Sequence, residues 1–426
     1  MNNLLKITLF FVFFANNFCD IFAFDFEVFE NKIYNANIKT VQFYPKGYNL
    51  AAPITPLGSE EKLILGFDDF SNELKDYFYT VVQCDFEWKA TSLYFNEYIE
   101  GYNEGSLRDY DFSAGTKQKY IHYKLEFPNL DMTITKSGNY ALVAYEGRPE
   151  NVLFVQRFMV YENGVQINAS VNTPRMIGAD NFQQIQFSVS HKGFPIENAY
   201  QEIKTTVLQN DRVDNAKIGI QPLFIRDNEL IFNQNNDLVF FAGKEFREFD
   251  TRTIRFKGEG VNNIELTDST NTFYLIPYPI RSNSSYQQDR DLNGKYYIDI
   301  QEKWRDDYEA DYVKVKFLLP MELPVGNGDI YIYGGFNNWQ LNEENRMVYK
   351  EDLGGYIGEL LVKQGFYNYE YIFVDDKKEI VDHRMTEGNY YNTDNDYTIL
   401  VYYRPFTDRY DRLIGVRFIN SITDRF

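Results

Sequence analysis

The chain has few of the residues that support covalent or metal-based chemistry. Its 426 residues include 2 cysteines, 3 histidines and 3 tryptophans. If the N-terminal stretch that carries Cys19 is removed, Cys84 is the one cysteine left, and an intramolecular disulfide is impossible. His122, His191 and His383 lie far apart, and no His/Cys cluster has the spacing of a zinc site. We therefore expect domains held together by their hydrophobic cores, with no metal and no cofactor.

Positive charge and long apolar runs are also scarce. The net charge is −19, so counterion release gives no drive toward nucleic acid, and an anionic membrane surface repels the chain. Beyond the N-terminus there is no run of about 18 consecutive apolar residues, so we expect no membrane-spanning helix in the mature chain.

Enzyme motifs are missing as well. The sequence has no glycine-rich phosphate loop before a helix and no nucleophile elbow. The acid pairs Asp68-Asp69, Asp306-Asp307 and Asp375-Asp376 are of a kind that binds calcium or carries out acid/base chemistry, but in so acidic a chain such pairs are typical of solvated loops. We therefore expect a protein that is not an enzyme.

The N-terminus has the pattern of a targeting segment. Residues 1–6 carry one positive charge, and residues 7–15 form a short apolar run that is too short for a stable transmembrane helix. This pattern predicts a signal peptide at residues 1–23, with cleavage near Ala23. Lipidation at Cys19 is the alternative, although the residues before it match that signal poorly.

Aromatic residues are abundant and favour strands. There are 35 Tyr and 37 Phe, and short alternating segments are separated by Gly, Pro and Asn, which is the signature of β-sandwiches. We predict an all-β fold of three tandem immunoglobulin-like or early-set β-sandwich domains after the signal peptide. The expected divisions are a first sandwich at 24–163, a second at 164–280, a polar linker at 281–294 and a C-terminal early-set-like sandwich with a tail at 295–426.

The last of these domains holds the sharpest local pattern. Strands are predicted at 329–333, 356–362 and 366–374, the first followed by Gly-Gly-Phe-Asn-Asn and Trp339. A further strand is expected within 389–403, and the tail at 412–421 is expected either to add one more strand or to dock on a partner.

This region resembles the glycogen-binding early-set sandwich modules, whose aromatic side chains stack on sugar rings. It departs from them at Tyr356, near where a second Trp is common, and at Asp375-Asp376, where an Asp-Gly turn is usual. The resemblance implies six candidates for glycan stacking, which are equally candidates for contact with a protein partner, with Trp339 also a candidate cap of the core or of a domain interface: Phe336, Trp339, Tyr356, Tyr367, Tyr369 and Tyr371.

A second resemblance extends over nearly the whole chain. In order, the matching pieces resemble the plug protein family of the type IX secretion system of Bacteroidetes, and the chain departs from that family at Gln83, where many relatives have His. The pieces are Gln83-Cys84-Asp85 through Trp88, Tyr98-x-x-Gly101, Asp109-Tyr110-Asp111-Phe112-Ser113, Tyr120-Ile121-His122-Tyr123, Ser137-Gly138-Asn139-Tyr140, Arg157-Phe158-Met159-Val160, Gln209-Asn210, Glu245-Phe246-Arg247, Glu387-Gly388-Asn389-Tyr390 through Thr393-x-Asn395, Val401-Tyr402-Tyr403-Arg404 and Arg409-Tyr410-Asp411.

The plug resemblance implies a non-catalytic periplasmic protein that associates peripherally with the outer membrane. Its implied partner is the large outer-membrane translocon barrel, which the plug would occlude at the periplasmic opening while no substrate is engaged. The early-set resemblance leaves one alternative open, an envelope carbohydrate-binding protein that uses the C-terminal module.

Overall fold

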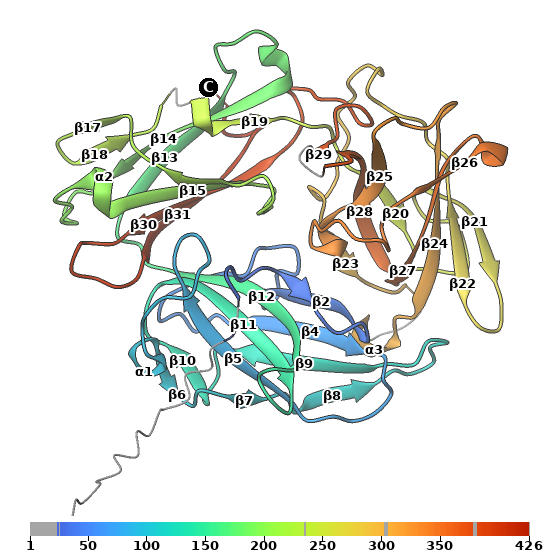
Figure 1. Cartoon of the computed structure of the whole chain (residues 1–426), viewed down its shortest axis with the longest axis horizontal. Coiled ribbons are helices and arrows are strands. Elements are labelled where there is room, and N and C mark those ends of the chain that lie inside the picture. Colours follow the sequence, from blue (N-terminus) through green and yellow to red (C-terminus); the bar gives the residue numbers. More distant parts are fainter. Residues whose placement is uncertain (1–23, 25, 234–235, 302–305, 378–380, 426) are drawn as a thin grey trace, which may run out of the picture.

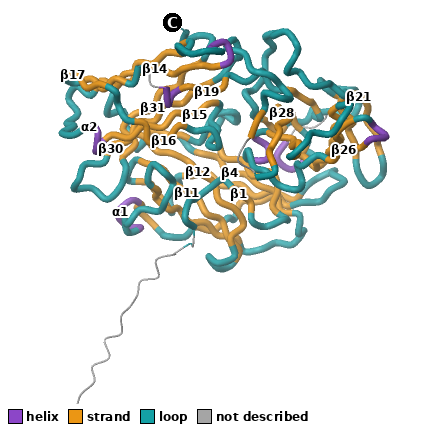
Figure 2. The backbone as a smooth tube through the Cα atoms, turned by 45° about the horizontal axis from the view of Figure 1, so that its top comes forward, coloured by secondary structure: helices purple, strands orange, loops and turns teal. Residues whose placement is uncertain are grey.

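Three β-sandwiches contain almost all of the regular structure, as the computed structural model shows in Figure 1, where the first lies at the bottom, the second at the upper left and the third on the right. The structure describes residues 24, 26–233, 236–301, 306–377 and 381–425. Helix is confined to short segments, while strands run through all three bodies (Figure 2). The predicted all-β fold is therefore confirmed. The signal peptide expected at residues 1–23 lies outside the described residues.

The first sandwich consists of two main sheets around one aromatic-rich core. Its buried residues include Phe67, Tyr123 and Phe154, which pack ring against ring. One sheet has the order β1-β12-β11-β5-β7 with β3 beside β12, and the other has the order β2-β4-β9-β8. The elements are β1 (Lys32–Ile33), β2 (Ile38–Pro45), β3 (Ile54–Pro56), β4 (Leu63–Asp69), β5 (Tyr77–Cys84), α1 (Phe95–Tyr98), β6 (Ile99–Gly101), β7 (Gly105–Ser106), β8 (Asp109–Phe112), β9 (Ile121–Phe127), β10 (Met132–Ile134), β11 (Gly138–Glu146) and β12 (Val152–Tyr161).

The second sandwich is built from two distant parts of the chain. One sheet has the order β13-β14-β18-β17 with β19 beside β14, and the other has the order β16-β15-β30-β31. The elements are β13 (Gln166–Asn172), η1 (Ala179–Asn181), β14 (Phe182–Ser190), α2 (Ala199–Glu202), β15 (Ile203–Gln209), β16 (Lys217–Ile220), β17 (Phe224–Arg226), β18 (Glu229–Ile231), η2 (Asn236–Leu238), β19 (Val239–Phe241), β30 (Asp396–Tyr403) and β31 (Arg412–Asn420).

Strands β30 and β31 correct the expected division of the chain. The sequence predicts them in the C-terminal sandwich at 295–426, but β30 pairs with β15 from Ile203 opposite Tyr403 to Gln209 opposite Tyr397. The physical reason is the inward row Tyr397, Ile399 and Val401, which is buried in the core of the second sandwich. The tail at 412–421 adds the strand β31, one of the two outcomes expected for it.

The third sandwich begins earlier than 295. Its core takes Phe249 from β20 and Val261 and Phe273 from the next hairpin, all of which had been expected in the second domain at 164–280. One sheet has β28 at its centre and the other has the order β21-β22-β24-β27-β26. The elements are β20 (Arg247–Asp250), β21 (Val261–Leu266), β22 (Asn271–Leu275), β23 (Tyr296–Ile298), α3 (Asp306–Glu309), β24 (Tyr312–Pro320), β25 (Gly328–Tyr333), η3 (Gly335–Asn337), β26 (Val348–Lys350), η4 (Glu351–Leu353), β27 (Gly355–Lys363), β28 (Gly365–Asp375) and β29 (Val381–Asp382).

The segment 281–294, expected to be a linker between domains, is fixed against the protein. The guanidinium of Arg281 donates to the carboxylate of Glu387 at 2.6 Å, and the Tyr286 hydroxyl donates to the carbonyl of Asn392 at 2.8 Å. The half-buried Asp291 carboxylate accepts from the backbone N–H groups of Phe246 and Asn293, at 2.5 and 3.0 Å, and burial raises its pKa to about 7. The polar residues of segment 281–294 therefore make contacts within the protein. In the sequence, the segment lies between strands β22 and β23 of the third sandwich.

Candidate functional site: the junction of the three sandwiches

Chemically unusual side chains gather where the sandwiches meet. At the contact between the first and third sandwiches, the Asp68 carboxylate is fully buried and accepts from the Lys363 ammonium at 2.7 Å, the Tyr312 hydroxyl at 2.6 Å and the His122 ring at 2.7 Å. Lys363 also lies over the Tyr120 ring, 4.4 Å from its centroid. Burial alone would raise the pKa of Asp68, but Lys363 and His122 outweigh it and hold that pKa below its ordinary value.

This cluster corrects the expectation of solvated acid pairs. Asp68 and Asp69 both lie in β4 with no exposed surface, and Asp69 accepts from the Tyr77 hydroxyl at 2.8 Å. By contrast, Asp376 is exposed. A buried carboxylate needs an ion pair or hydrogen bonds to offset its burial: Asp68 has both, and Asp69 accepts hydrogen bonds from Ser71 and Tyr77.

A second buried charge cluster joins the second and third sandwiches. The Arg212 guanidinium donates to Asp214 at 2.7 and 3.1 Å and to Glu370 of β28 at 3.1 Å. The side chains of Arg212 and Glu370 are 8% and 7% exposed. The two carboxylates hold the pKa of Arg212 above its ordinary value against the opposing effect of burial, whereas burial raises the pKa of Glu370 more than Arg212 lowers it.

Trp339 belongs to this second cluster. The Arg212 guanidinium lies 4.2 Å from the centroid of its ring, and the rings of Tyr333 and Phe246 contact it edge-on at 5.3 and 5.8 Å. Gly294 lies so close that a Cβ atom there would be 2.3 Å from the indole. With these groups around the ring, Trp339 is half-buried at the domain interface and does not form an open stacking platform.

The other aromatic candidates are placed mainly in the core. Tyr356 is 5% exposed, and Tyr367, Tyr369 and Tyr371 are 2% exposed each, so these rings present no face to a sugar or a partner. Half-buried Phe336 packs edge-on against Tyr367 at 5.9 Å. The strands themselves were predicted correctly, as β25, β27 and β28 show. Both faces of β28 are covered. One face packs in the core of the third sandwich, and the other is covered by the cluster around Arg212, Glu370 and Trp339.

The pieces of sequence that resemble the plug family pair with each other across the fold. The Arg247 guanidinium binds the buried Glu387 carboxylate at 2.8 Å, and the Asn210 side-chain amide donates to Asn395 at 2.8 Å. In the same way, the Tyr402 hydroxyl donates to the Asn139 side chain at 2.9 Å, between the second and first sandwiches. Sequence motifs that are weak evidence individually are thus hydrogen-bonded to one another in the folded protein.

An apolar interface completes the contact between the first and second sandwiches. Buried Trp88, Val143 and Val155 from the first pack with Leu208, Leu400 and Leu413 from the second. Cys84 is fully buried in this interface, and burial raises the pKa of its thiol far above the ordinary value. The three sandwiches are therefore joined by two buried charge clusters and one apolar layer.

Exposed apolar side chains gather at one edge of the second sandwich. The strands β16 and β17 follow each other in the chain and are the edge strands of the two sheets. The exposed residues there are Tyr200, Ile218, Leu223, Phe224 and Ile225. The sequence gives no signal for this surface, because the same residue types fill the cores.

Neither metal chemistry nor a membrane helix is indicated for the part of the chain that the structure describes. Within those residues no three His, Cys, Asp or Glu side chains come together as a metal ion would require. Among the same residues, no helix combines the length and the apolar character that crossing a membrane requires.

Fold and site together define a class: an all-β protein of three sandwiches joined through buried interfaces, without a recognisable catalytic centre among the described residues. A family model described as "Type 9 secretion system plug protein 1st domain" matches residues 38–162, which is the first sandwich. A search of curated proteins found no significant match.

Among solved structures, the chain is similar to a hypothetical protein from Parabacteroides merdae. The identity is 34%, the match covers 92% of this chain and 99% of that one, and the TM-score is 0.88. The C-terminal domain of the Streptococcus pyogenes antigen I/II-family protein AspA matches with 8% identity over 89% of this chain and 98% of that chain, and its TM-score of 0.14 carries no argument. Through residues 38–162, the chain carries the first domain of the type 9 secretion system plug protein family.

Proposed function

We propose that this protein is a non-catalytic plug that docks on the periplasmic opening of the type IX outer-membrane translocon. It occludes the pore while no substrate is engaged and leaves when one arrives. The observation that carries the proposal is the plug-family first domain at residues 38–162, together with whole-length similarity to a relative that shares all three sandwiches. The proposed location is the periplasm, at the inner face of the outer membrane.

The joined architecture supports this role on physical grounds. Blocking a wide pore requires a body larger than one sandwich that keeps its shape when it is pressed against the opening. The pairs Asp68–Lys363 and Arg212–Glu370 join separate sandwiches and are buried, so salt does not screen them as it screens surface pairs. The net charge of −19 keeps the detached protein dispersed.

Reversible docking requires exposed apolar side chains in a limited area. We propose the β16–β17 edge of the second sandwich as the contact, because β17 also has a backbone edge that is unpaired within the described residues. An edge of this kind accepts an added strand from a partner. Phe224 is 61% exposed there, as an anchor for a partner pocket must be.

The direct test is copurification from outer membranes. The native protein is expected to copurify with a very large barrel protein, and Phe224→Ser is expected to reduce its yield about tenfold, as for an anchor worth roughly 1.4 kcal/mol. Phe256→Ser is the matched control, since Phe256 is 57% exposed on the third sandwich. Copurification without any barrel protein would refute the plug proposal, and equal loss in both variants would refute the proposed edge.

A deletion strain gives an independent test. A strain without the plug is expected to admit large solutes through empty translocons, so its sensitivity to an antibiotic that normally fails to pass the outer membrane rises. Unchanged sensitivity while the translocon is present and empty would contradict the proposal.

Trp339 lies against Arg212, Tyr333 and Phe246, which argues against the alternative of carbohydrate binding.

A further inference from the structure

Strand β8 forms an open edge at the bottom of the first sandwich in Figure 1. It ends the sheet β2-β4-β9-β8 and, within the described residues, pairs with β9 alone. The backbone N–H of Ser113 donates to the carbonyl of Tyr120 at 2.9 Å, on the side of β9. Because such groups alternate along an antiparallel strand, the N–H and C=O groups of Tyr110 and Phe112 point away from β9. Among the described residues they have no backbone partner, so this edge can accept another strand.

One face of β8 continues the apolar face of its sheet beyond the core. Tyr110 lies opposite Tyr123, and Phe112 lies opposite Ile121. Tyr123 and Ile121 are 1% and 0% exposed, whereas Tyr110 and Phe112 are 40% and 57% exposed. The Tyr110 ring lies 5.9 Å from the Tyr123 ring and contacts Phe112 edge-on at 5.9 Å. A strand added beside β8 would therefore cover two aromatic rings with its own apolar side chains.

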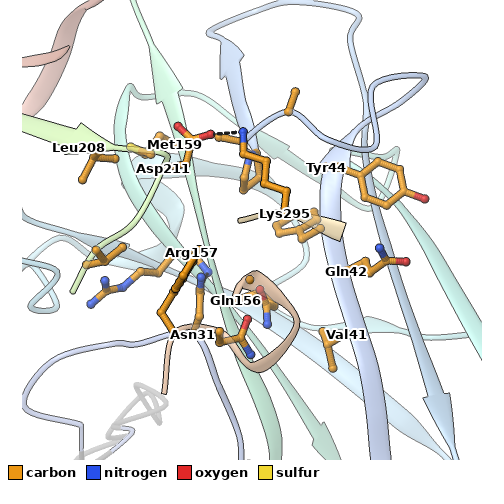
Figure 3. Close-up of a pocket in the computed structure, with 18 of the residues that line it drawn as sticks. Asn31, Val41, Gln42, Tyr44, Gln156, Arg157, Met159, Leu208, Asp211 and Lys295 are labelled. Atoms are coloured by element: carbon orange, nitrogen blue, oxygen red, sulfur yellow. Dashed lines mark hydrogen bonds and ion pairs between the residues drawn. The ribbon is translucent and has the colours of Figure 1, made fainter. Parts of the chain in front are cut away.

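The other face of β8 carries two exposed carboxylates without a counterion. Within the described residues, Asp109 and Asp111 form no ion pair and no side-chain hydrogen bond. The charges at the junction of the three sandwiches are different. The cavity of about 440 Å³ there is lined by Lys295 and Asp211, which bind each other at 2.6 Å, a contact drawn as a dashed line in Figure 3. The charges of that cavity are therefore paired, whereas the carboxylates of β8 can pair with a partner.

The residues of β9 opposite these carboxylates bind other groups. His122, opposite Asp111, contacts the buried Asp68 carboxylate at 2.7 Å. Lys124, opposite Asp109, has its ammonium 3.9 Å from a carboxylate of α3. A cation on an added strand would lie beside Asp109 and Asp111, where opposite charges on neighbouring strands attract each other.

We propose that the open edge of β8 binds an extended segment of a partner protein in which basic and apolar residues alternate. The segment adds as a further strand, with its apolar side chains over Tyr110 and Phe112 and its cations beside Asp109 and Asp111. A second copy of this chain does not fit, because pairing two β8 strands would bring like charges together. The β17 edge carries the exposed Arg226 where β8 carries carboxylates, so the two edges select different partners. The proposal does not depend on the proposed plug function.

The test measures binding of a labelled, end-capped peptide of alternating lysine and valine to the full mature chain, by fluorescence anisotropy at about 0.15 M salt. Native protein is expected to bind this peptide and not one of alternating glutamate and valine. The double variant Asp109→Lys, Asp111→Lys is expected to bind about tenfold more weakly, because two attractive pairs become repulsive. The matched control is Glu351→Lys with Asp352→Lys, at exposed residues of the third sandwich. It changes the net charge equally, so it separates binding at β8 from general attraction to an acidic protein.

Hydrogen exchange locates the added strand. The backbone amides of residues 109–113 are expected to exchange more slowly when the lysine–valine peptide is bound. Phe112→Pro removes a ring and an N–H that points away from β9, so it is expected to abolish binding while the sheet stays folded. No binding to native protein, equal binding of the two peptides, equal weakening in the two double variants, or protection at β17 in place of β8 would overturn the proposal. None of these outcomes changes the copurification and permeability tests of the plug function.

Discussion

Replacing Arg212 by Met tests whether the buried charge cluster holds the second and third sandwiches together. The change removes three hydrogen bonds to carboxylates, at 2.7, 3.1 and 3.1 Å, and the cation that lies 4.2 Å from the centre of the Trp339 ring. Asp214 is 26% exposed and can be solvated, but Glu370 is 7% exposed and would remain as a buried charge without a partner. Breaking a buried pair in this way costs about 3–5 kcal/mol.

The loss is measured by urea denaturation followed through tryptophan fluorescence, to which Trp339 contributes. Arg212→Met is expected to lower the unfolding midpoint strongly, and Glu370→Gln added to it is expected to restore part of the loss, because the unpaired charge is then removed. Arg346→Met is the control, since Arg346 pairs with Asp329 on the surface and is 42% exposed; no measurable change is expected there. Equal midpoints for the native protein and Arg212→Met would refute the reasoning.

Three other predictions concern single groups. Arg247 and Arg281 outweigh burial and lower the pKa of Glu387 from 4.5 to about 2; its contribution, on the order of 3 kcal/mol, is therefore complete above about pH 4.5 and is lost as the pH falls toward 2. Glu387→Gln should flatten the dependence of unfolding midpoint on pH in that window, and an unchanged slope would contradict this assignment. The buried Cys84 thiol should react with a thiol reagent only after denaturation, and rapid labelling of native protein would contradict its burial. Trp339→Ala should leave migration through glucan-containing native gels unchanged, and glucan retardation abolished by this variant would instead support the carbohydrate alternative.

Local patterns predicted the strands well. The alternation of residues 366–374 predicts β28 to within one residue at each end, and the strand predicted at 356–362 likewise falls within β27 (Gly355–Lys363). These segments were predictable because their periodicity reflects which side chains face a core.

Long-range pairing was not predictable to the same degree. Nothing local in residues 396–403 shows that they pair with β15 and not with the sandwich that precedes them. The burial of both faces of β28 was also not predictable. In the sequence, Glu370 has the pattern of a solvent-facing residue, and only the fold shows that it pairs with Arg212. Arg212 itself, in a turn after Asn210-Asp211, carries no local signal of its role.

The closing strands of the second sandwich constrain the order in which the chain can fold. The first sandwich is complete once residue 161 has emerged, whereas β15 waits for β30 while all of residues 210–395 pass. Until then Ile203 and Val207, fully buried in the finished protein, have no partner strand on that side. A chain crossing a membrane from its N-terminus would therefore expose a half-built sheet while residues 210–395 follow, and we expect it to need a chaperone during that interval. Limited proteolysis of a chain ended at residue 395 should leave the first sandwich intact and digest the strands that depend on β30.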